Sequence, residues 1–229
     1  MKSWIALLFG LVLCAFPVHA ERANHSITYQ KKNLDFAYYV PDKLKSKSNL
    51  TAIVLVPGLS GRGDSMIDQA WMEFADKTQR IIIAPSFVFE GEDAFQKGKS
   101  YQYPKVWSGP ALNQILKEFS SVGYSIKSLY MMGFSAGAQF VGRYALLYPQ
   151  KVKKCAIIAS GGNDKITKSV PVKFFYGIGA NDADNRQQFA KDFETQAKSK
   201  HISLTKKIYP GVGHSLTADM QNDVRQFFK

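Results

Sequence analysis

Cysteine and histidine are scarce in this chain. Its 229 residues include two cysteines, Cys14 and Cys155, and four histidines. Cys14 lies in a segment that we expect to be removed from the mature protein, so no internal disulfide is expected. Cys155 stands in an apolar run, which favours a buried, inert thiol over a nucleophile. The few histidines and the remaining cysteine show no metal-ligand spacing, so we expect no metal, and nothing implies an organic cofactor.

Acidic residues are also few. The chain has 18 Asp and Glu against 30 Lys and Arg, a formal net charge of +12. The lysines are scattered and no nucleic-acid-binding motif accompanies them, so we expect no nucleic-acid partner. A solvated basic surface is the plainest interpretation, and such a surface attracts anionic partners such as an anionic cell-envelope surface. The oligomeric state stays open.

The first twenty residues are typical of a secretory signal peptide. Lys2 provides a positive start, an apolar run follows over residues 4–16, and small residues precede Glu21. The run is short for a membrane span, which needs about 20 apolar residues. We therefore predict cleavage after Ala20, export to the periplasm or the medium, and one catalytic domain over residues 21–229.

Short apolar runs alternate with amphipathic segments along the rest of the chain, without repeats or long linkers. This alternation predicts an α/β fold, with a mostly parallel central sheet covered by helices on both faces. An antiparallel pair, 26–30 and 34–40, opens the chain. Further strands are expected over 52–56, 80–84, 129–132, 154–159, 172–176 and 202–208. Helices are expected over 65–78, 111–121, 138–148, 186–200 and 216–228, the first capped by Asp64 and the second begun by Pro110.

The most informative motif is G-x-S-x-G, spelled by residues 133–137 between a predicted strand and a predicted helix. A serine on so sharp a turn is held in a strained backbone conformation with its hydroxyl exposed. Gly133 and Gly137 leave room for the turn. We therefore predict Ser135 to be a nucleophile.

An aspartate and a histidine follow later strands. Asp182 comes just after the 172–176 strand and His214 just after the last strand. Serine needs a neighbouring imidazole to take its proton, and the imidazole needs a carboxylate to fix its tautomer. Asp184 and Asp164 remain alternatives for the acid. His25 and His201, the other histidines after residue 20, do not follow the last strand.

A glycine-rich loop over residues 57–63 ends the 52–56 strand. Such a loop can point a backbone N–H at the oxyanion of a tetrahedral intermediate. We assign the two oxyanion donors to the backbones of Leu59 and Ala136.

With these residues placed, the chain resembles α/β-hydrolases from about Ser26 onward. Within them it is similar to secreted esterases of the polyhydroxybutyrate-depolymerase and feruloyl-esterase type, and more loosely to dienelactone hydrolases. The resemblance rests on residues 133–137, the turn 179–182, Gly213-His214 and the Pro57-Gly58 loop. Many relatives have a histidine where Pro57 stands.

The resemblance implies a serine esterase that forms an acyl-enzyme and acts on a small or polymeric ester. An acyltransferase with the same triad, or a non-catalytic surface-binding module on the same scaffold, are alternatives. Few residues separate the strands after the motif, so no large cap domain is expected. The aromatic loop 86–109 is the main candidate for a pocket wall. We predict Trp107 and Phe134 to contact substrate.

Overall fold

Eight strands form one sheet in the order β1-β2-β4-β3-β5-β6-β7-β8. The computed structural model describes residues 22–30, 32–59, 62–87 and 100–229. The predicted signal peptide, residues 1–20, lies outside them. The strands are β1 (Ala23–Tyr29), β2 (Lys32–Tyr39), β3 (Leu50–Val56), β4 (Ile82–Pro85), β5 (Ile126–Phe134), β6 (Val152–Ile158), β7 (Lys173–Gly179) and β8 (Leu204–Tyr209).

The sheet is parallel from β4 to β8, and β1 and β2 extend it as an antiparallel pair. Val56 at the end of β3 pairs with Gly133, and Phe134 at the end of β5 pairs with Ile158. The carboxyl ends of these neighbouring strands therefore meet at one edge, where ligand chemistry gathers in such sheets.

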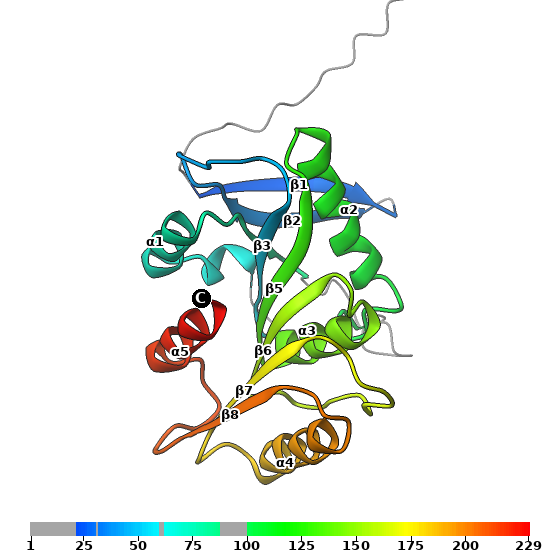
Figure 1. Cartoon of the computed structure of the whole chain (residues 1–229), viewed down its shortest axis with the longest axis vertical. Coiled ribbons are helices and arrows are strands. Elements are labelled where there is room, and N and C mark those ends of the chain that lie inside the picture. The colour runs from blue at the N-terminus through cyan, green and yellow to red at the C-terminus, as the bar shows by residue number, and fades with distance from the viewer. Residues whose placement is uncertain (1–21, 31, 60–61, 88–99) are drawn as a thin grey trace, which may run out of the picture.

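Helices cover both faces of the sheet (Figure 1). They are α1 (Gln69–Thr78), α2 (Ser108–Ser121), α3 (Ala136–Leu147), α4 (Asp184–Ser199) and α5 (Ala218–Phe228). Helices α2, α3 and α4 pack on one face through Leu112, Phe140 and Phe193. Helices α1 and α5 pack on the other through Trp71 and Phe228. The predicted mostly parallel sheet with helices on both faces is confirmed, and no large cap domain is evident among the described residues.

The expected helix over residues 65–78 is wrong in its first turn. The structure has a short 3₁₀ helix over Gly63–Met66 and begins α1 at Gln69. The N-cap is Asp68, not Asp64, because the Asp68 side chain accepts a hydrogen bond from the Trp71 N–H at 2.8 Å. An aspartate side chain that accepts from a backbone N–H of the first turn is a common helix cap, and here Asp68 has that role.

Helix α2 begins at Ser108, three residues before the predicted start. Pro110 therefore lies inside the first turn, where its missing N–H would have had no intrahelical partner. The remaining elements differ from their predicted bounds by a few residues at their ends. No helix among the described residues has the length and apolar character needed to cross a membrane.

Candidate active site

Ser135 occupies a sharp turn between β5 and α3. Its φ is 54° and its ψ is −113°, a conformation that costs energy for any residue with a side chain. A Cβ on Gly133 would lie 2.2 Å from the Gly137 oxygen, and one on Gly137 would lie 2.3 Å from the Val56 oxygen. Both glycines are thus required by close backbone approach, and the turn has the geometry expected from the motif.

His214 lies between Ser135 and Asp182. Its Nε2 is 2.9 Å from the Ser135 Oγ, and its Nδ1 is 3.0 Å from the Asp182 Oδ2. The three side chains follow β5, β7 and β8, so the parallel sheet brings together residues that are far apart in sequence. The structure places them in one hydrogen-bonded chain, serine to imidazole to carboxylate.

The Asp182 carboxylate is almost fully buried, with 1% of its side chain exposed. Its Oδ1 accepts a hydrogen bond from the Ala183 N–H at 2.8 Å, and the Arg186 Nη1 lies 3.7 Å from the same oxygen. A buried charge needs such partners to remain ionised. The carboxylate is therefore equipped to orient the imidazole of His214 and to stabilise its protonated form.

The other aspartates and histidines considered for the site have different neighbours in the structure. Asp164 forms an ion pair with Arg143, 2.7 Å between the Arg143 Nε and the Asp164 Oδ1. Asp184 is the first residue of α4 and is exposed. His25 lies on β1 against Phe36, and His201 lies between α4 and β8. The imidazole–carboxylate pair of the site is thus His214 with Asp182.

The two predicted oxyanion donors belong to α3 and to the loop after β3. Ala136 begins α3, so its N–H has no carbonyl one turn earlier to bind. The 57–59 segment passes beside the serine: a Cβ on Gly58 would lie 3.7 Å from the Ser135 Cβ. Leu59, the next residue, is partly exposed. The N-terminus of α3 and the loop that carries Leu59 are therefore both next to Ser135.

The two residues predicted to contact substrate have different surroundings. Phe134 stacks on His214, with ring centroids 5.1 Å apart. Trp107 is half-buried and packs edge-on against Phe87, which in turn contacts Phe140 in the core. Its packing ties the start of α2 to the body of the protein. Phe89 and Phe95 of the aromatic loop lie outside the described residues.

Three residues that support the site were not predicted. Arg186 is one helical turn from Asp182, a spacing that could have indicated the pairing. Arg143 donates to Asp164 and to the Gln102 carbonyl, and so joins the segments after β6 and before α2. Arg143 is the one charged residue of α3, and that was an available signal.

Tyr101 donates a hydrogen bond to the Pro57 carbonyl at 3.1 Å. Burial raises the pKa of the Tyr101 hydroxyl, which keeps its proton for this bond. This bond fixes the loop that carries Leu59. Nothing in the local sequence around residue 101 pointed to Pro57, 44 residues away.

Cys155 lies in the middle of β6, fully buried, and burial raises the pKa of its thiol. Among residues 22–30, 32–59, 62–87 and 100–229, no group of three or more His, Cys, Asp and Glu side chains is placed to hold a metal ion.

The sheet order and the serine turn define the α/β-hydrolase class of folds. Residues 51–212 match the sequence model described as alpha/beta hydrolase fold, and the chain belongs to that family. No curated protein sequence matches the chain.

Solved structures share the fold at low sequence identity. An S-formylglutathione hydrolase from Agrobacterium tumefaciens superposes with a TM-score of 0.69 at 15% identity, covering 90% of this chain and 92% of that one. A poly(3-hydroxybutyrate) depolymerase from Bordetella parapertussis gives 0.68 at 15% identity, with 92% and 90% covered. A ferulic acid esterase gives 0.69 at 11% identity, with 91% and 98% covered. The expected resemblance to depolymerase-type and feruloyl-esterase-type folds is confirmed.

Proposed function

We propose that this protein is a serine hydrolase that cleaves carboxylic esters through an acyl-enzyme intermediate. The observation that carries the proposal is the continuous chain from the Ser135 Oγ through His214 to the buried Asp182 carboxylate, with both separations within hydrogen-bonding range. A serine hydroxyl becomes a useful nucleophile only when such an imidazole can accept its proton.

The first half of the reaction acylates the enzyme. His214 Nε2 takes the Ser135 proton while the Oγ attacks the ester carbonyl carbon. The N–H groups of Leu59 and Ala136 donate to the resulting oxyanion, an arrangement in which each donor typically contributes about 10²–10³ in rate. The C–O bond to the alcohol then breaks, and the alcohol leaves with the proton held by His214. Asp182 stays ionised throughout.

The second half frees the acid. Water enters the position vacated by the alcohol and gives a proton to His214 as its oxygen attacks the acyl carbon. The bond to the Ser135 Oγ breaks, and the oxygen recovers its proton from His214. Phe134 and Trp107 are proposed to contact the substrate, which is a small or polymeric ester. An acceptor alcohol in place of water would make the same site an acyltransferase.

The test is hydrolysis of p-nitrophenyl esters from acetate to palmitate by the wild type and by Ser135→Ala. We expect turnover in the wild type and a loss of at least about 10³-fold in the variant, which keeps its circular-dichroism spectrum. A fluorophosphonate probe should form one adduct, on Ser135. Activity that survives in Ser135→Ala would contradict the proposal, and a folded wild type that neither turns over nor labels would indicate a non-catalytic binding module. Formation of a transesterified product with an added alcohol would identify an acyltransferase.

Export is a second part of the proposal. The N-terminal segment supports it by its composition alone: a lysine, an apolar run and small residues before Glu21. N-terminal sequencing of the protein recovered from a cell-envelope or medium fraction should begin at Glu21. Recovery of the intact N-terminus from the cytoplasm would contradict export.

A further inference from the structure

Exposed lysines gather at the amino edge of the sheet, opposite the edge that holds Ser135. They stand at the starts of β5, β6 and β7, on the second half of α2, and on the segments that lead into β3, β6 and β7: Lys43, Lys45, Lys47, Lys117, Lys127, Lys151, Lys153, Lys168 and Lys173. We call this set the lysine edge. The only acids on the same stretches, residues 40–49, 117–127, 151–153 and 168–173, are Asp42 and Glu118.

These segments are neighbours in space. The Ser125 N–H donates to the Lys47 carbonyl at 2.7 Å, and the Leu129 N–H donates to the Lys151 carbonyl at 2.8 Å. Lys154, at the start of β6, pairs in register with Lys173. Burial, with the nearby charges of Arg80 and Lys173, lowers the pKa of Lys154. The segments that carry the lysine edge are thus linked to one another through their backbones.

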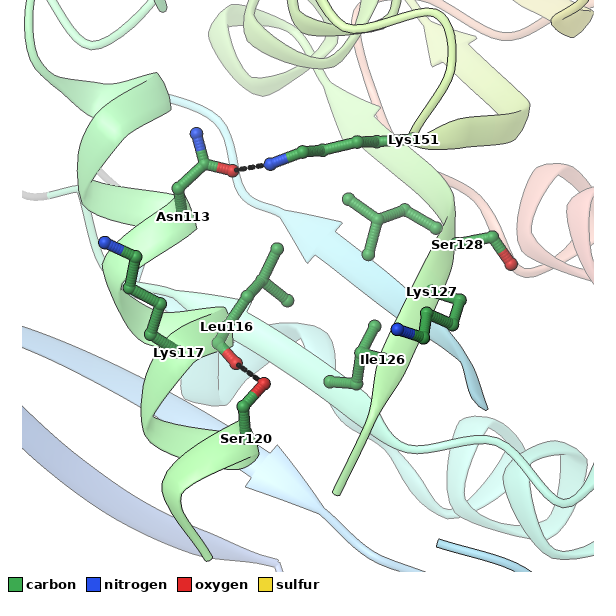
Figure 2. Close-up of a pocket in the computed structure, with 9 residues that line it drawn as sticks. Asn113, Leu116, Lys117, Ser120, Ile126, Lys127, Ser128 and Lys151 are labelled. Atoms are coloured by element: carbon green, nitrogen blue, oxygen red, sulfur yellow. Dashed lines mark hydrogen bonds between the residues drawn. The ribbon is translucent and has the colours of Figure 1, made fainter. Parts of the chain in front are cut away.

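A cavity of about 220 Å³ lies within it, between the second half of α2 and the start of β5 (Figure 2). Its walls carry Lys117, Lys127 and Lys151, and Leu116, Ile126 and Leu129 give it an apolar lining. Lys127 extends from β5 toward α2, and Lys151 donates to the Asn113 side chain at 2.8 Å, which leaves two of its three ammonium protons for other acceptors.

The opposite edge has a different balance of charge. Exposed acids Asp68, Asp164, Asp184 and Asp219 stand on the segments around the carboxyl ends of the strands, among the exposed cations Arg62, Lys105 and Lys165. Positive charge is therefore in larger excess at the lysine edge, and approach of an anionic surface is favoured from that side.

We propose that the lysine edge docks the protein on an anionic phospholipid bilayer, with a lipid headgroup phosphate seated in the cavity between α2 and β5. Lysine is a compact, strongly hydrated charge, suited to diffuse attraction by a surface rather than to bidentate recognition. The apolar lining fits the glycerol and first methylenes of a lipid, which a wholly polar polyanion lacks. Docked in this way, the protein turns Ser135 toward the water, so its substrate comes from the aqueous side.

The test is sedimentation of the full chain with vesicles. This assay measures binding and needs no turnover, so its result does not depend on the reaction proposed at Ser135. One vesicle contains phosphatidylglycerol mixed with phosphatidylcholine, and the other is pure phosphatidylcholine. Any binding by the apolar run at residues 4–16 is common to both vesicles and to all variants. We expect partitioning to be strong on the anionic vesicles, and to be lost between roughly 0.1 M and 1 M salt.

The decisive variant is Lys117→Gln/Lys127→Gln/Lys151→Gln, and its matched control is Arg62→Gln/Lys105→Gln/Lys191→Gln, which removes the same charge elsewhere. The first should bind anionic vesicles about a hundredfold more weakly and still cleave a soluble ester, while the control changes by about threefold or less. Equal losses in both variants would overturn the proposal. So would wild-type protein that binds soluble polyphosphate but not the anionic vesicles, because a polymer would then be the partner.

Discussion

The imidazole of His214 lies against the phenyl ring of Phe134, with ring centroids 5.1 Å apart and an interplanar angle of 29°. Phe134 is the residue before Ser135, so the same turn that presents the hydroxyl also supplies a surface for the imidazole. The imidazole is thus fixed at three places: by the Asp182 carboxylate, by the Ser135 hydroxyl and by this ring.

Replacing Phe134 should loosen the base without removing it. We expect Phe134→Ala to lower kcat by about tenfold, since an aromatic pair contributes about 0.5–1.5 kcal/mol. Phe134→Tyr keeps the ring and should retain most of the rate. Steady-state kinetics on a short p-nitrophenyl ester would measure both, and equal rates in the alanine and tyrosine variants would show that the ring does not position His214.

Asp182 and Asp164 give a matched pair of acid variants. Asp182→Asn leaves the imidazole with a partner that favours the wrong tautomer, so kcat should fall by about 10³–10⁴. Asp164→Asn removes only the exposed partner of Arg143, with 53% of the Asp164 side chain exposed, and should leave kcat within a few-fold of the wild type. A larger loss in Asp164→Asn than in Asp182→Asn would transfer the role of the acid to Asp164.

Two glycines of α3 should differ in how well they tolerate alanine. In Gly137→Ala the new Cβ would lie 2.3 Å from the Val56 carbonyl oxygen, so the backbone must shift. Thermal unfolding should show Tm lowered by about 5 °C, with activity lost. In Gly142→Ala the nearest atom is the Ile157 Cδ1 at 3.2 Å, the far end of a flexible side chain. There the better helix propensity of alanine should keep Tm within about 2 °C of the wild type. A Gly137→Ala protein as stable as wild type would refute the close-packing argument.

The Cys155 thiol should be unreactive in the native protein. Burial raises its pKa, so at pH 8 it stays in the neutral form, which is a poor nucleophile. Iodoacetamide should leave the Cys155 peptide unmodified under native conditions and alkylate it in guanidinium, as mass spectrometry would show. Cys155→Ala should cleave esters at the wild-type rate, and a loss of turnover in a folded Cys155→Ala protein would implicate the thiol in the reaction.

Much of the fold could be predicted from the sequence because each strand is a short, continuous apolar run. The runs at residues 52–56 and 154–159 are bounded by turn residues or charges, which local physics can identify. The sequence could predict that Ser135, Asp182 and His214 lie at the same edge of the sheet, because each follows a strand and parallel strands end at one edge. Their separations depend on the register of the sheet, which no local pattern encodes.

The parts that could not be predicted depend on contacts between distant segments. Asp64 and Asp68 are the same residue type, and the structure has the Asp68 side chain as the cap, beside a Trp71 ring that packs against Phe228 of α5. The bond from Tyr101 to the Pro57 carbonyl joins residues that only the finished fold brings together. The lysine edge likewise could not be predicted, because its lysines are scattered along the sequence. Only the topology of the sheet brings them together.

The backbone at Ser135 has a consequence for any search for sturdier variants. A positive φ is unfavourable for serine and natural for glycine, so Ser135→Gly should unfold at a higher temperature than the wild type. Selection for heat resistance alone would thus favour a protein that has lost its proposed nucleophile. Such a selection must therefore measure turnover as well as thermal stability. At position 135, stability favours glycine and turnover requires serine.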